Sequence, residues 1–406
     1  MKNKQMLPVF LTVFIDMLGI GIIIPVIPAL FFEPTSDFFT TEINNADRSV
    51  LYGWLLAAYP IMQFFGAPIL GALSDRYGRK PLLMLSLFGT MVGYFLFAVA
   101  LLNGSLWLLI FSRMLPGFTG GNISIVYSAI ADISEGSERT KNFGFVGMAF
   151  GLGFILGPAL GGLMADESVV SWFNAATPFW FTTFITAVNI VLVYRLFKET
   201  LQEKGTRAVS FFTGFRNIAY SFRTPNLRVV FAVSLLLTLG FGFFTQFFAV
   251  ALIDKFAYTE KDIGIMYAWV GVWLVITQGG LVPRLAKKYP PATLLKVTIL
   301  TLAAGVFLVT FPDHIAWEFA FAPVIAISQG IAAPNLISVI SGQASQTQQG
   351  QILGINQSMQ SFGAALPPAV GGYLAAIDVL YPLFTAAAVI TLSWLVFTVF
   401  FRGKAA

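Results

Sequence analysis

Residues 144–162 read GFVGMAFGLGFILGPALGG, and residues 354–372 read GINQSMQSFGAALPPAVGG. At a constant offset of 210 residues, four glycines and one proline of the first stretch coincide with those of the second. A weaker echo pairs the Gly71 region with GGLVPRLAKKYP, which begins at Gly279. The chain therefore contains an internal repeat, and the composition of the segments around it indicates the kind of fold that is repeated.

The composition is that of a membrane protein. Hydrophobic residues make up 57% of the 406 residues and charged residues only 11%, whereas soluble domains carry about 25% charged residues. An apolar run of about 20 residues spans a bilayer as a helix. Such runs cover residues 6–32, 50–73, 81–102, 105–131, 141–165, 176–197, 227–253, 262–286, 292–312, 315–340, 350–375 and 379–401.

These segments predict an all-α membrane protein with twelve transmembrane helices in two six-helix pseudo-symmetric bundles. We expect one bundle at residues 1–198, a cytoplasmic linker with an amphipathic helix at residues 199–226, and a second bundle at residues 227–406. Parallel repeats of this kind are typical of transporters, which hold their substrate near the bilayer midplane.

The basic residues predict the orientation. If the N-terminus is cytoplasmic, only Arg48, Lys255 and Lys261 of the 24 lysines and arginines fall in outer connections, and Arg113 falls inside a span. Such a bias marks the cytoplasmic side. We therefore expect a multi-pass protein of the plasma (inner) membrane with both termini in the cytoplasm, and we interpret residues 6–32 as an uncleaved first span because the run is too long for a signal peptide.

The residue types exclude several classes of function. Cysteine is absent and His314 is the only histidine, so cysteine nucleophiles and poly-histidine metal sites are excluded. No span holds paired carboxylates, and no nucleotide-binding loop is present. We expect no enzyme activity, cofactor, metal or nucleic-acid partner, and a monomer surrounded by lipid.

Two charged side chains are predicted deep inside the spans. Asp16, in FIDMLGIG, lies roughly 15 Å from the inner start of its span, and Arg113, in FSRMLPG, roughly 12 Å from the outer end of its own. Charges at this depth are costly and usually functional. We expect Asp16 to load and release a proton while Arg113 tunes it; the alternative is a static ion pair.

A charged connection separates the second and third spans. It reads GALSDRYGRK, residues 71–80, and concentrates charge between two apolar runs. Asp75 lies at an inner helix end, where it can face the positive N-terminus of a neighbouring helix, and the bases can pair with acids at other helix ends. The alternative is that the bases only enforce topology.

The span-five stretch that opens the repeat has its own pattern. Gly153, Gly157 and Gly161 are spaced four apart and predict a smooth face for close helix packing. Pro158 leaves a carbonyl unbonded and permits a bend. A generic packing helix would explain the small residues but not the whole spacing.

With these motifs the chain resembles the major facilitator superfamily, and within it the drug–proton antiporters of the tetracycline-efflux type. The resemblance implies that the charged connection is a conformational latch and that span five carries an antiporter motif. The implied latch residues are Gly71, Asp75, Arg76, Gly78, Arg79, Lys80, Asp132, Glu138 and Arg139. The implied motif residues are Gly144, Gly153, Gly157, Pro158, Gly161 and Gly162.

The resemblance departs at two positions. Tetracycline exporters carry an acid in span three before a tyrosine, where this chain has Gly93 before Tyr94, and a membrane histidine, whereas His314 lies in an outer connection. Both departures argue against tetracycline itself. Amides within or near the spans suggest a cavity for a neutral or amphipathic molecule, although helix–helix contacts would explain them equally. The candidate cavity residues are Asn122, Gln246, Gln278, Asn335 and Gln357.

The sequence thus predicts a proton-coupled exporter of small amphipathic organic compounds that works by alternating access. The alternatives are a dedicated exporter of one metabolite, siderophore or lipid-like molecule, and a non-transporting membrane receptor.

Overall fold

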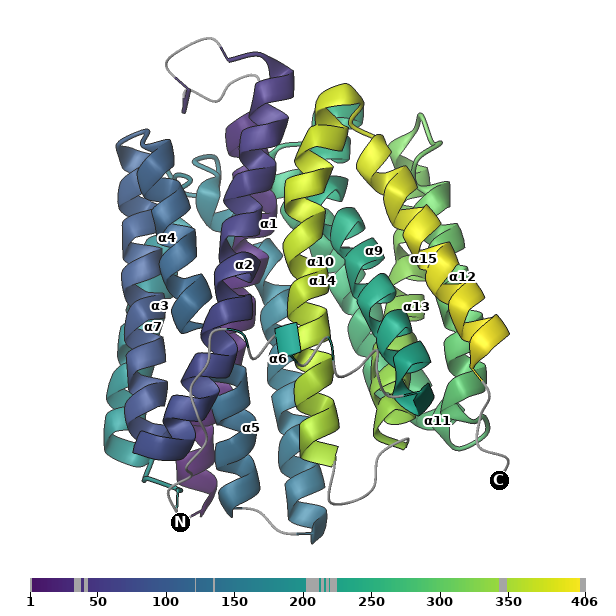
Figure 1. The fold of residues 1–406 in the computed structure, drawn as a ribbon. Helices are drawn as coiled ribbons and strands as arrows, with labels where there is room; N and C mark the ends of the chain where they lie inside the picture. Colours follow the sequence, from purple (N-terminus) through teal and green to yellow (C-terminus); the bar gives the residue numbers. More distant parts are fainter. Residues whose placement is uncertain are drawn as a thin grey trace. The chain divides into compact units, whose positions relative to one another are not determined.

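The computed structural model describes residues 2–32, 38–39, 43–120, 122–133, 136–201, 212, 215–216, 219, 225–342 and 349–401. Every regular element in these ranges is a helix, so the all-α prediction is confirmed (Figure 1). The helices are α1 (Lys2–Phe32), α2 (Asn45–Tyr77), α3 (Arg79–Leu102), α4 (Leu106–Thr119), α5 (Asn122–Ile133), α6 (Gly136–Ala165), α7 (Thr177–Leu196), α9 (Pro225–Phe256), α10 (Glu260–Ile276), η1 (Thr277–Leu281), α11 (Val282–Ala286), α12 (Pro291–Leu308), α13 (Ile315–Gly342), α14 (Gln349–Ile377) and α15 (Tyr381–Phe400).

The helices form two compact units whose segments interleave along the sequence. The first comprises Met1–Ile43, Ala58–Thr213 and Tyr258–Ile265, and the second comprises Asn44–Ala57, Gly214–Ala257 and Met266–Ala406. The start of α2 thus belongs to the second unit, and the start of α10 to the first. Of the predicted amphipathic helix in the linker, the structure describes only residues 212, 215–216 and 219.

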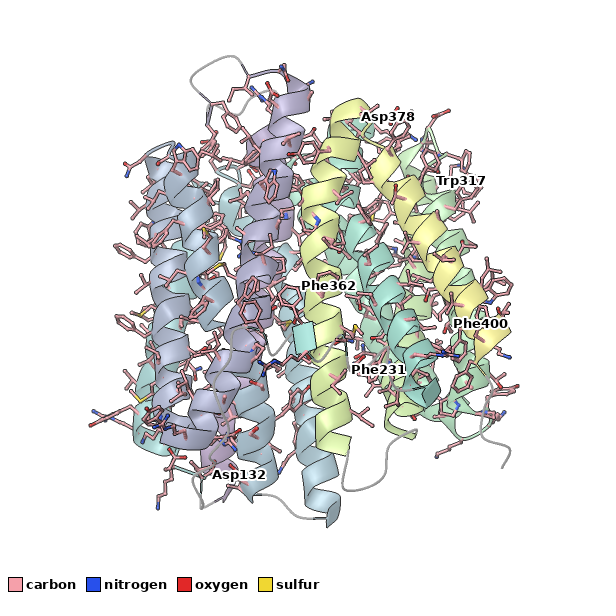
Figure 2. The ribbon with its side chains drawn as sticks, viewed as in Figure 1. Asp132, Phe231, Trp317, Phe362, Asp378 and Phe400 are labelled. Carbon is pink, nitrogen blue, oxygen red and sulfur yellow. The ribbon has the colours of Figure 1, made fainter. Side chains whose placement is uncertain are left out.

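Nine helices in the described part of the chain are long and apolar enough to cross a membrane. They correspond to the predicted spans other than the fourth, fifth and eleventh, which are α4–α5, α6 and α14. Large apolar side chains such as Trp317 and Phe400 are exposed on the helices, as expected where a protein faces lipid (Figure 2).

Two predicted spans are not continuous α-helices. The fourth is interrupted after Thr119, where Gly120 donates its N–H to the carbonyl of Pro116 and a new helix, α5, begins at Asn122. The eighth contains a five-residue π-helical segment, η1, between α10 and α11. Irregular backbone of this kind within a membrane helix is frequent at functional sites.

The first unit packs α1 closely onto α6. A Cβ atom at Gly153 would lie 2.5 Å from the carbonyl oxygen of Phe14, one at Gly157 2.6 Å from that of Leu18, and one at Gly161 2.7 Å from that of Ile22. These distances are too short for any other residue, so the glycine face of α6 lies directly on the α1 backbone. This contact fixes the segment of α1 that carries Asp16.

A hydrophobic core holds α5 in place beside α1, α3 and α7. Its fully buried side chains include Val9, Leu83, Ile125, Val126 and Val193. In a bilayer, where lipid is as apolar as these side chains, it is their close van der Waals packing that holds the helices together. The short helix α5 is therefore part of a rigid framework, although its twelve residues alone would be marginal as a helix.

Candidate functional site

Asp16 is buried within α1 and faces the start of α5. Its side chain is 9% exposed. The carboxyl group faces the side-chain amide of Asn122, the first residue of α5. Asn122 is 1% exposed, and its Nδ2 makes no hydrogen bond within the usual geometric limits. The acid therefore lies near the positive end of a half-length helix, an arrangement suited to a negative charge.

Arg113 on α4 is buried without a carboxylate partner. It is 6% exposed, its guanidinium carbon lies 4.7 Å from the centre of the Tyr59 ring, and its Nε has no hydrogen-bond partner. Among the described residues, no nitrogen of Arg113 lies within 4.0 Å of a carboxylate oxygen. The structure thus does not contain the static Asp16–Arg113 ion pair that was the alternative explanation for these residues.

Two tyrosines complete this group, which we call the buried cluster: Asp16, Tyr59, Tyr94, Arg113 and Asn122. The charges of Asp16 and Arg113 both act on the hydroxyls of Tyr59 and Tyr94. The Tyr94 hydroxyl lies against the Cα atom of Gly19, where a side chain would collide with it. The cluster therefore draws on α1, α2, α3, α4 and α5, and its five residues all lie within the first unit.

Gly93 explains one departure from the tetracycline exporters. A Cβ atom at Gly93 would lie 2.6 Å from both Cδ and Cγ of Pro116. The close approach of α3 to α4 therefore leaves no room for an acidic side chain at this position. The buried cluster is built with Asp16 as its carboxylate.

A second group, the Arg79 network, joins the ends of α2, α3 and α5. The guanidinium of Arg79 forms ion pairs with Asp75 and, at 3.2 Å, with Asp132, and donates a hydrogen bond of 2.8 Å to Ser74 Oγ. Arg79 itself is 6% exposed. Figure 2 shows Asp132 at the end of α5. The geometry brings together three of the predicted latch residues.

Glu199, just after α7, completes the network and was not predicted. Its carboxylate accepts hydrogen bonds from the backbone N–H groups of Arg79 (2.8 Å) and Lys80 (3.1 Å), which begin α3. Gly78, with φ of 112°, leaves space for this carboxylate. Partial burial raises the pKa of Glu199, but hydrogen bonds from four backbone N–H groups, of Leu201, Arg79, Lys80 and Thr200, outweigh it and lower the pKa below the usual value.

The other predicted residues are distributed more widely. Lys80 donates to the Tyr194 carbonyl (2.7 Å), Arg76 is exposed over Tyr77, and Gly71 lies at ordinary contact distance from Ser124. The side chains of Glu138 and Arg139, and the surroundings of Gly144, lie outside what the structure describes.

Four of the five candidate cavity amides belong to the second unit: Gln246, Gln278, Asn335 and Gln357. Asn335 donates to the Ile331 carbonyl (2.7 Å) and Gln278 is exposed in η1, so only Asn122 belongs to the buried cluster.

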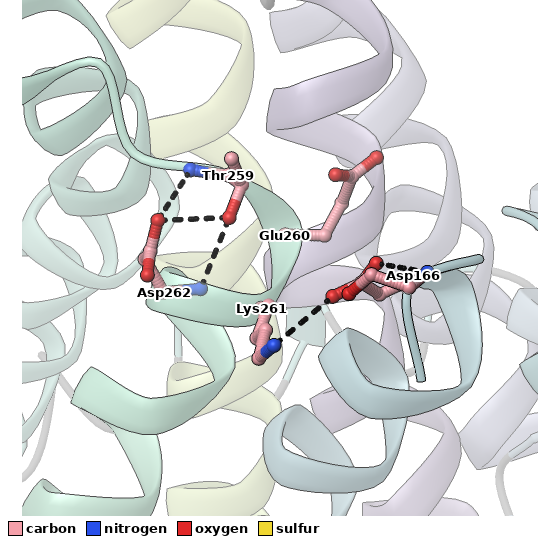
Figure 3. A pocket seen from close by; sticks show the side chains of 6 residues that line it. Asp166, Thr259, Glu260, Lys261 and Asp262 are labelled. Atoms are coloured by element: carbon pink, nitrogen blue, oxygen red, sulfur yellow. Dashed lines mark hydrogen bonds and ion pairs between the residues drawn. The ribbon is translucent and has the colours of Figure 1, made fainter. Parts of the chain in front are cut away.

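At the other end of α6, Gly162 contacts the start of α10. A Cβ atom at Gly162 would lie 2.5 Å from the Glu260 carbonyl oxygen and 3.1 Å from Cα of Gly264. Beside this contact, Lys261 Nζ lies 3.6 Å from Asp166 Oδ2 (Figure 3). A polar pocket of about 440 Å³ is lined here by Asp166, Ser168, Thr259, Glu260, Lys261 and Asp262. It is far in sequence from the buried cluster, and its side chains pair with one another.

The second unit contains the counterpart of this glycine contact. A Cβ atom at Gly53 would lie 2.9 Å from Cα of Gly372, and Trp54 Nε1 donates to the Tyr373 hydroxyl at 3.2 Å. Gly372 is the repeat equivalent of Gly162 at the offset of 210. The internal repeat thus appears twice as a glycine–glycine helix contact, α6 with α10 and α2 with α14.

Glu318, in the first turn of α13, is a further buried charge that was not predicted. It is 1% exposed, and its Oε2 has no hydrogen-bond partner. Lys255 lies nearby but donates to the carbonyls of Thr310 (2.9 Å) and Pro312 (3.0 Å). The sequence concealed the burial of Glu318, because it places this residue only three residues into a predicted span, beside an outer connection.

Repeated apolar helices and a buried cluster with opposite charges are typical of polytopic membrane transporters. The sequence profile of the Major Facilitator Superfamily matches residues 9–366, and the chain belongs to this family.

Relatives and solved structures agree with this family. The chain is 30% identical over 388 residues to the class H tetracycline resistance protein of Pasteurella multocida, covering 93% of this chain and 91% of that protein. It is 28% identical to multidrug resistance protein 1 of Bacillus subtilis (strain 168), covering 95% and 93%. Its fold is similar to that of a D-xylose–proton symporter, with a TM-score of 0.80, 15% identity, and 98% of each chain covered. The chain is thus a major facilitator transporter related to tetracycline and multidrug efflux proteins.

Proposed function

We propose that this transporter is a proton-coupled antiporter that exports small amphipathic organic compounds by alternating access. Its place is a bacterial inner membrane, with both termini in the cytoplasm. The observation that carries the proposal is the buried carboxyl group of Asp16, which has no cation within 4.0 Å in the described residues. Such a group inside a membrane helix can hold a proton and exchange it for a substrate.

The surroundings of Asp16 suit such an exchange. Asn122 and the start of α5 favour the ionised carboxylate, while burial opposes an isolated charge. Arg113 lies in the same cluster without pairing directly with Asp16. A group poised between two charge states can respond to a substrate that enters the cluster.

Two further features support alternating access. The Arg79 network contains contacts that can form and break as a unit, because one guanidinium joins α2 and α5 at the start of α3. The Gly162–Gly264 and Gly53–Gly372 contacts provide smooth surfaces at the opposite helix ends. Transporters of this architecture alternate by rocking and need releasable contacts at both ends.

The relatives support export of drug-like molecules. Proteins named for tetracycline resistance and for multidrug resistance match more than nine-tenths of the chain. Gly93 leaves no room for the acid that tetracycline exporters carry at this position, so we propose a substrate other than tetracycline.

The proposal is tested in proteoliposomes that contain the purified protein and an internal pH-sensitive dye. A panel of fluorescent aromatic amphiphiles is applied with an imposed pH gradient. We expect the gradient to drive compound movement against the proton flow, and we expect Asp16→Asn to abolish the coupling while Glu167→Gln, an exposed loop acid, leaves it unchanged. Gradient-driven transport that persists in Asp16→Asn would overturn the role of Asp16, and no compound-linked proton movement in the wild type would overturn antiport.

A further inference from the structure

The buried cluster holds two opposite charges that are not paired with each other. Asp16 and Arg113 are 9% and 6% exposed, and both act on the hydroxyls of Tyr59 and Tyr94. The ion pairs within the described residues are Arg79–Asp75, Arg79–Asp132 and Lys261–Asp166. The two buried charges thus share neighbours without forming a bridge of their own.

One hydrogen-bond donor of the cluster lacks an acceptor. Arg113 Nε is buried and has no hydrogen-bond partner, whereas the Asn122 amide faces the Asp16 carboxyl group. More than nine-tenths of buried polar groups in proteins are satisfied, so a buried guanidinium nitrogen without an acceptor calls for an explanation. A ligand with an oxyanion would supply the missing acceptor.

The orientation of Arg113 favours a carboxylate-like group. The carbon of its guanidinium lies 4.7 Å from the centre of the Tyr59 ring. The N–H groups lie in the guanidinium plane, and the buried Nε has no hydrogen-bond partner. Planar oxyanions bind to the edge of a guanidinium plane through two parallel hydrogen bonds.

A ligand with only one charge would satisfy only half of the cluster. A cation on Asp16 would leave Arg113 and its Nε without an acceptor, and an anion on Arg113 would leave Asp16 protonated, so that no proton would be exchanged. A buried charge that loses its partner is strongly unfavourable. A ligand with both signs of charge satisfies both residues and adds no net charge to the membrane interior.

We propose, building on the proposed antiport function, that the substrate is a zwitterionic aromatic amphiphile. Its ammonium group donates hydrogen bonds to the Asp16 carboxylate, and its carboxylate or other oxyanion accepts them from Arg113. When the ammonium binds, Asp16 gives its proton to the aqueous phase; when the substrate leaves, Asp16 takes up a proton again. A substrate of zero net charge carries no charge out while the proton moves in.

The test uses aromatic amino acids on one naphthyl scaffold, with the ammonium and carboxylate separated by one to six carbons. For each spacing, the zwitterion is compared with its methyl ester, its N-acetyl acid and its N-acetyl ester, which are a cation, an anion and a neutral molecule. Binding to the purified protein is measured by isothermal titration calorimetry, and proton release with a pH dye in weak buffer. At the best spacing we expect the zwitterion to bind at least about tenfold more tightly than each of the others, because charge-assisted hydrogen bonds are the stronger ones.

Variants separate the two ends of the ligand. In Arg113→Gln we expect the zwitterion and its ester to bind equally, and in Asp16→Asn we expect the zwitterion and its N-acetyl acid to bind equally. Arg113→Lys keeps the charge but not the two-bond geometry, so an intermediate preference is expected. Thermal unfolding of each variant without ligand reports whether it folds, and the ligand comparison in the wild-type protein stands even if a variant does not.

Equal binding of the ester and the zwitterion in the wild type at every spacing would overturn the proposal. So would a preference for the zwitterion that survives Arg113→Gln unchanged. Either result leaves the proposed antiport intact if singly charged compounds still drive proton exchange through Asp16. Loss of all compound-linked proton exchange instead counts against the proposed function itself.

Discussion

Replacing Glu199 by alanine should loosen the Arg79 network. Glu199 closes the N-terminus of α3 by accepting from the N–H groups of Arg79 and Lys80, where Gly78 offers no side-chain cap. The first N–H groups of a helix have no partner within it, so a capping side chain from elsewhere in the chain must supply one. Here that side chain comes from 120 residues further along the sequence.

The size of the effect follows from the exposure of the carboxylate. Losing an N-cap costs about 0.5–2 kcal/mol. Glu199 is exposed, so water replaces part of the lost bonding, and we expect a loss near 1 kcal/mol rather than the upper limit. Glu199→Gln keeps a neutral acceptor and should lose less, whereas Glu167→Ala, which removes an exposed loop acid, should be close to neutral.

Two measurements check this prediction. Reversible unfolding in mixed micelles gives the free energy difference for each variant. Because the chain has no cysteine, a single Ala72→Cys, which places a thiol at a buried position of α2 near the network, reports its opening through the rate of maleimide labelling. We expect faster labelling when Glu199→Ala is added. Unfolding and labelling that match the wild type would refute the capping role, and equal effects from Glu167→Ala would show that loss of acidic charge, not of the cap, is responsible.

Three other outcomes follow from the structure. The difference in the free energy of unfolding between wild type and Glu199→Gln should be largest above the ordinary glutamate pKa of 4.5. It should shrink as the pH falls through the lowered pKa of Glu199, which unfolding measured from pH 7 to pH 3 would show. Gly157→Ala should destabilise the protein by roughly 1–3 kcal/mol because its Cβ atom would meet the Leu18 carbonyl. Gly279→Ala serves as the control, since a Cβ atom there has no neighbour within 4 Å, and equal unfolding energies for the two variants would contradict the packing argument. A double-mutant cycle on Asp166 and Lys261 should give a coupling below about 1 kcal/mol that falls with salt, since the Lys261 side chain is 42% exposed and its Nζ lies 3.6 Å from the carboxylate. A larger, salt-independent coupling would be inconsistent with this.

The sequence was sufficient for the features that depend on local composition. Long apolar runs predicted the helices because a bilayer segment must satisfy its own backbone hydrogen bonds. Asp16 and Arg113, which lie inside apolar runs, are buried as expected, and the glycine spacing of span five predicted the smooth face that packs on α1. Each of these properties depends on residues that are close together in the sequence.

Features that depend on contacts between distant residues were not predicted. Glu199 caps α3 only because the chain returns to Gly78 after forming the helices α3 to α7. Nothing near residue 199 in the sequence marks it as a cap. The Tyr59 ring under Arg113 is likewise a contact between α2 and α4. The break between α4 and α5 had a local signal, Pro116 followed by Gly120, but the apolar run continues through it and the hydropathy pattern concealed it.

The short helix α5 connects the two groups of charges. It begins at Asn122, which faces Asp16, and Asp132, which pairs with Arg79, lies ten residues later, about 15 Å along the axis. Because Ile125, Val126, Ala129 and Ile130 are fully buried in the core between these ends, α5 can shift only as a rigid body. A change in the hydrogen bonds that Asn122 offers to Asp16 or to a ligand therefore acts on the same element that holds the Arg79 guanidinium. We therefore propose that the packed helix α5 is the physical route by which proton loading of the buried cluster would release or restore the contacts of Arg79.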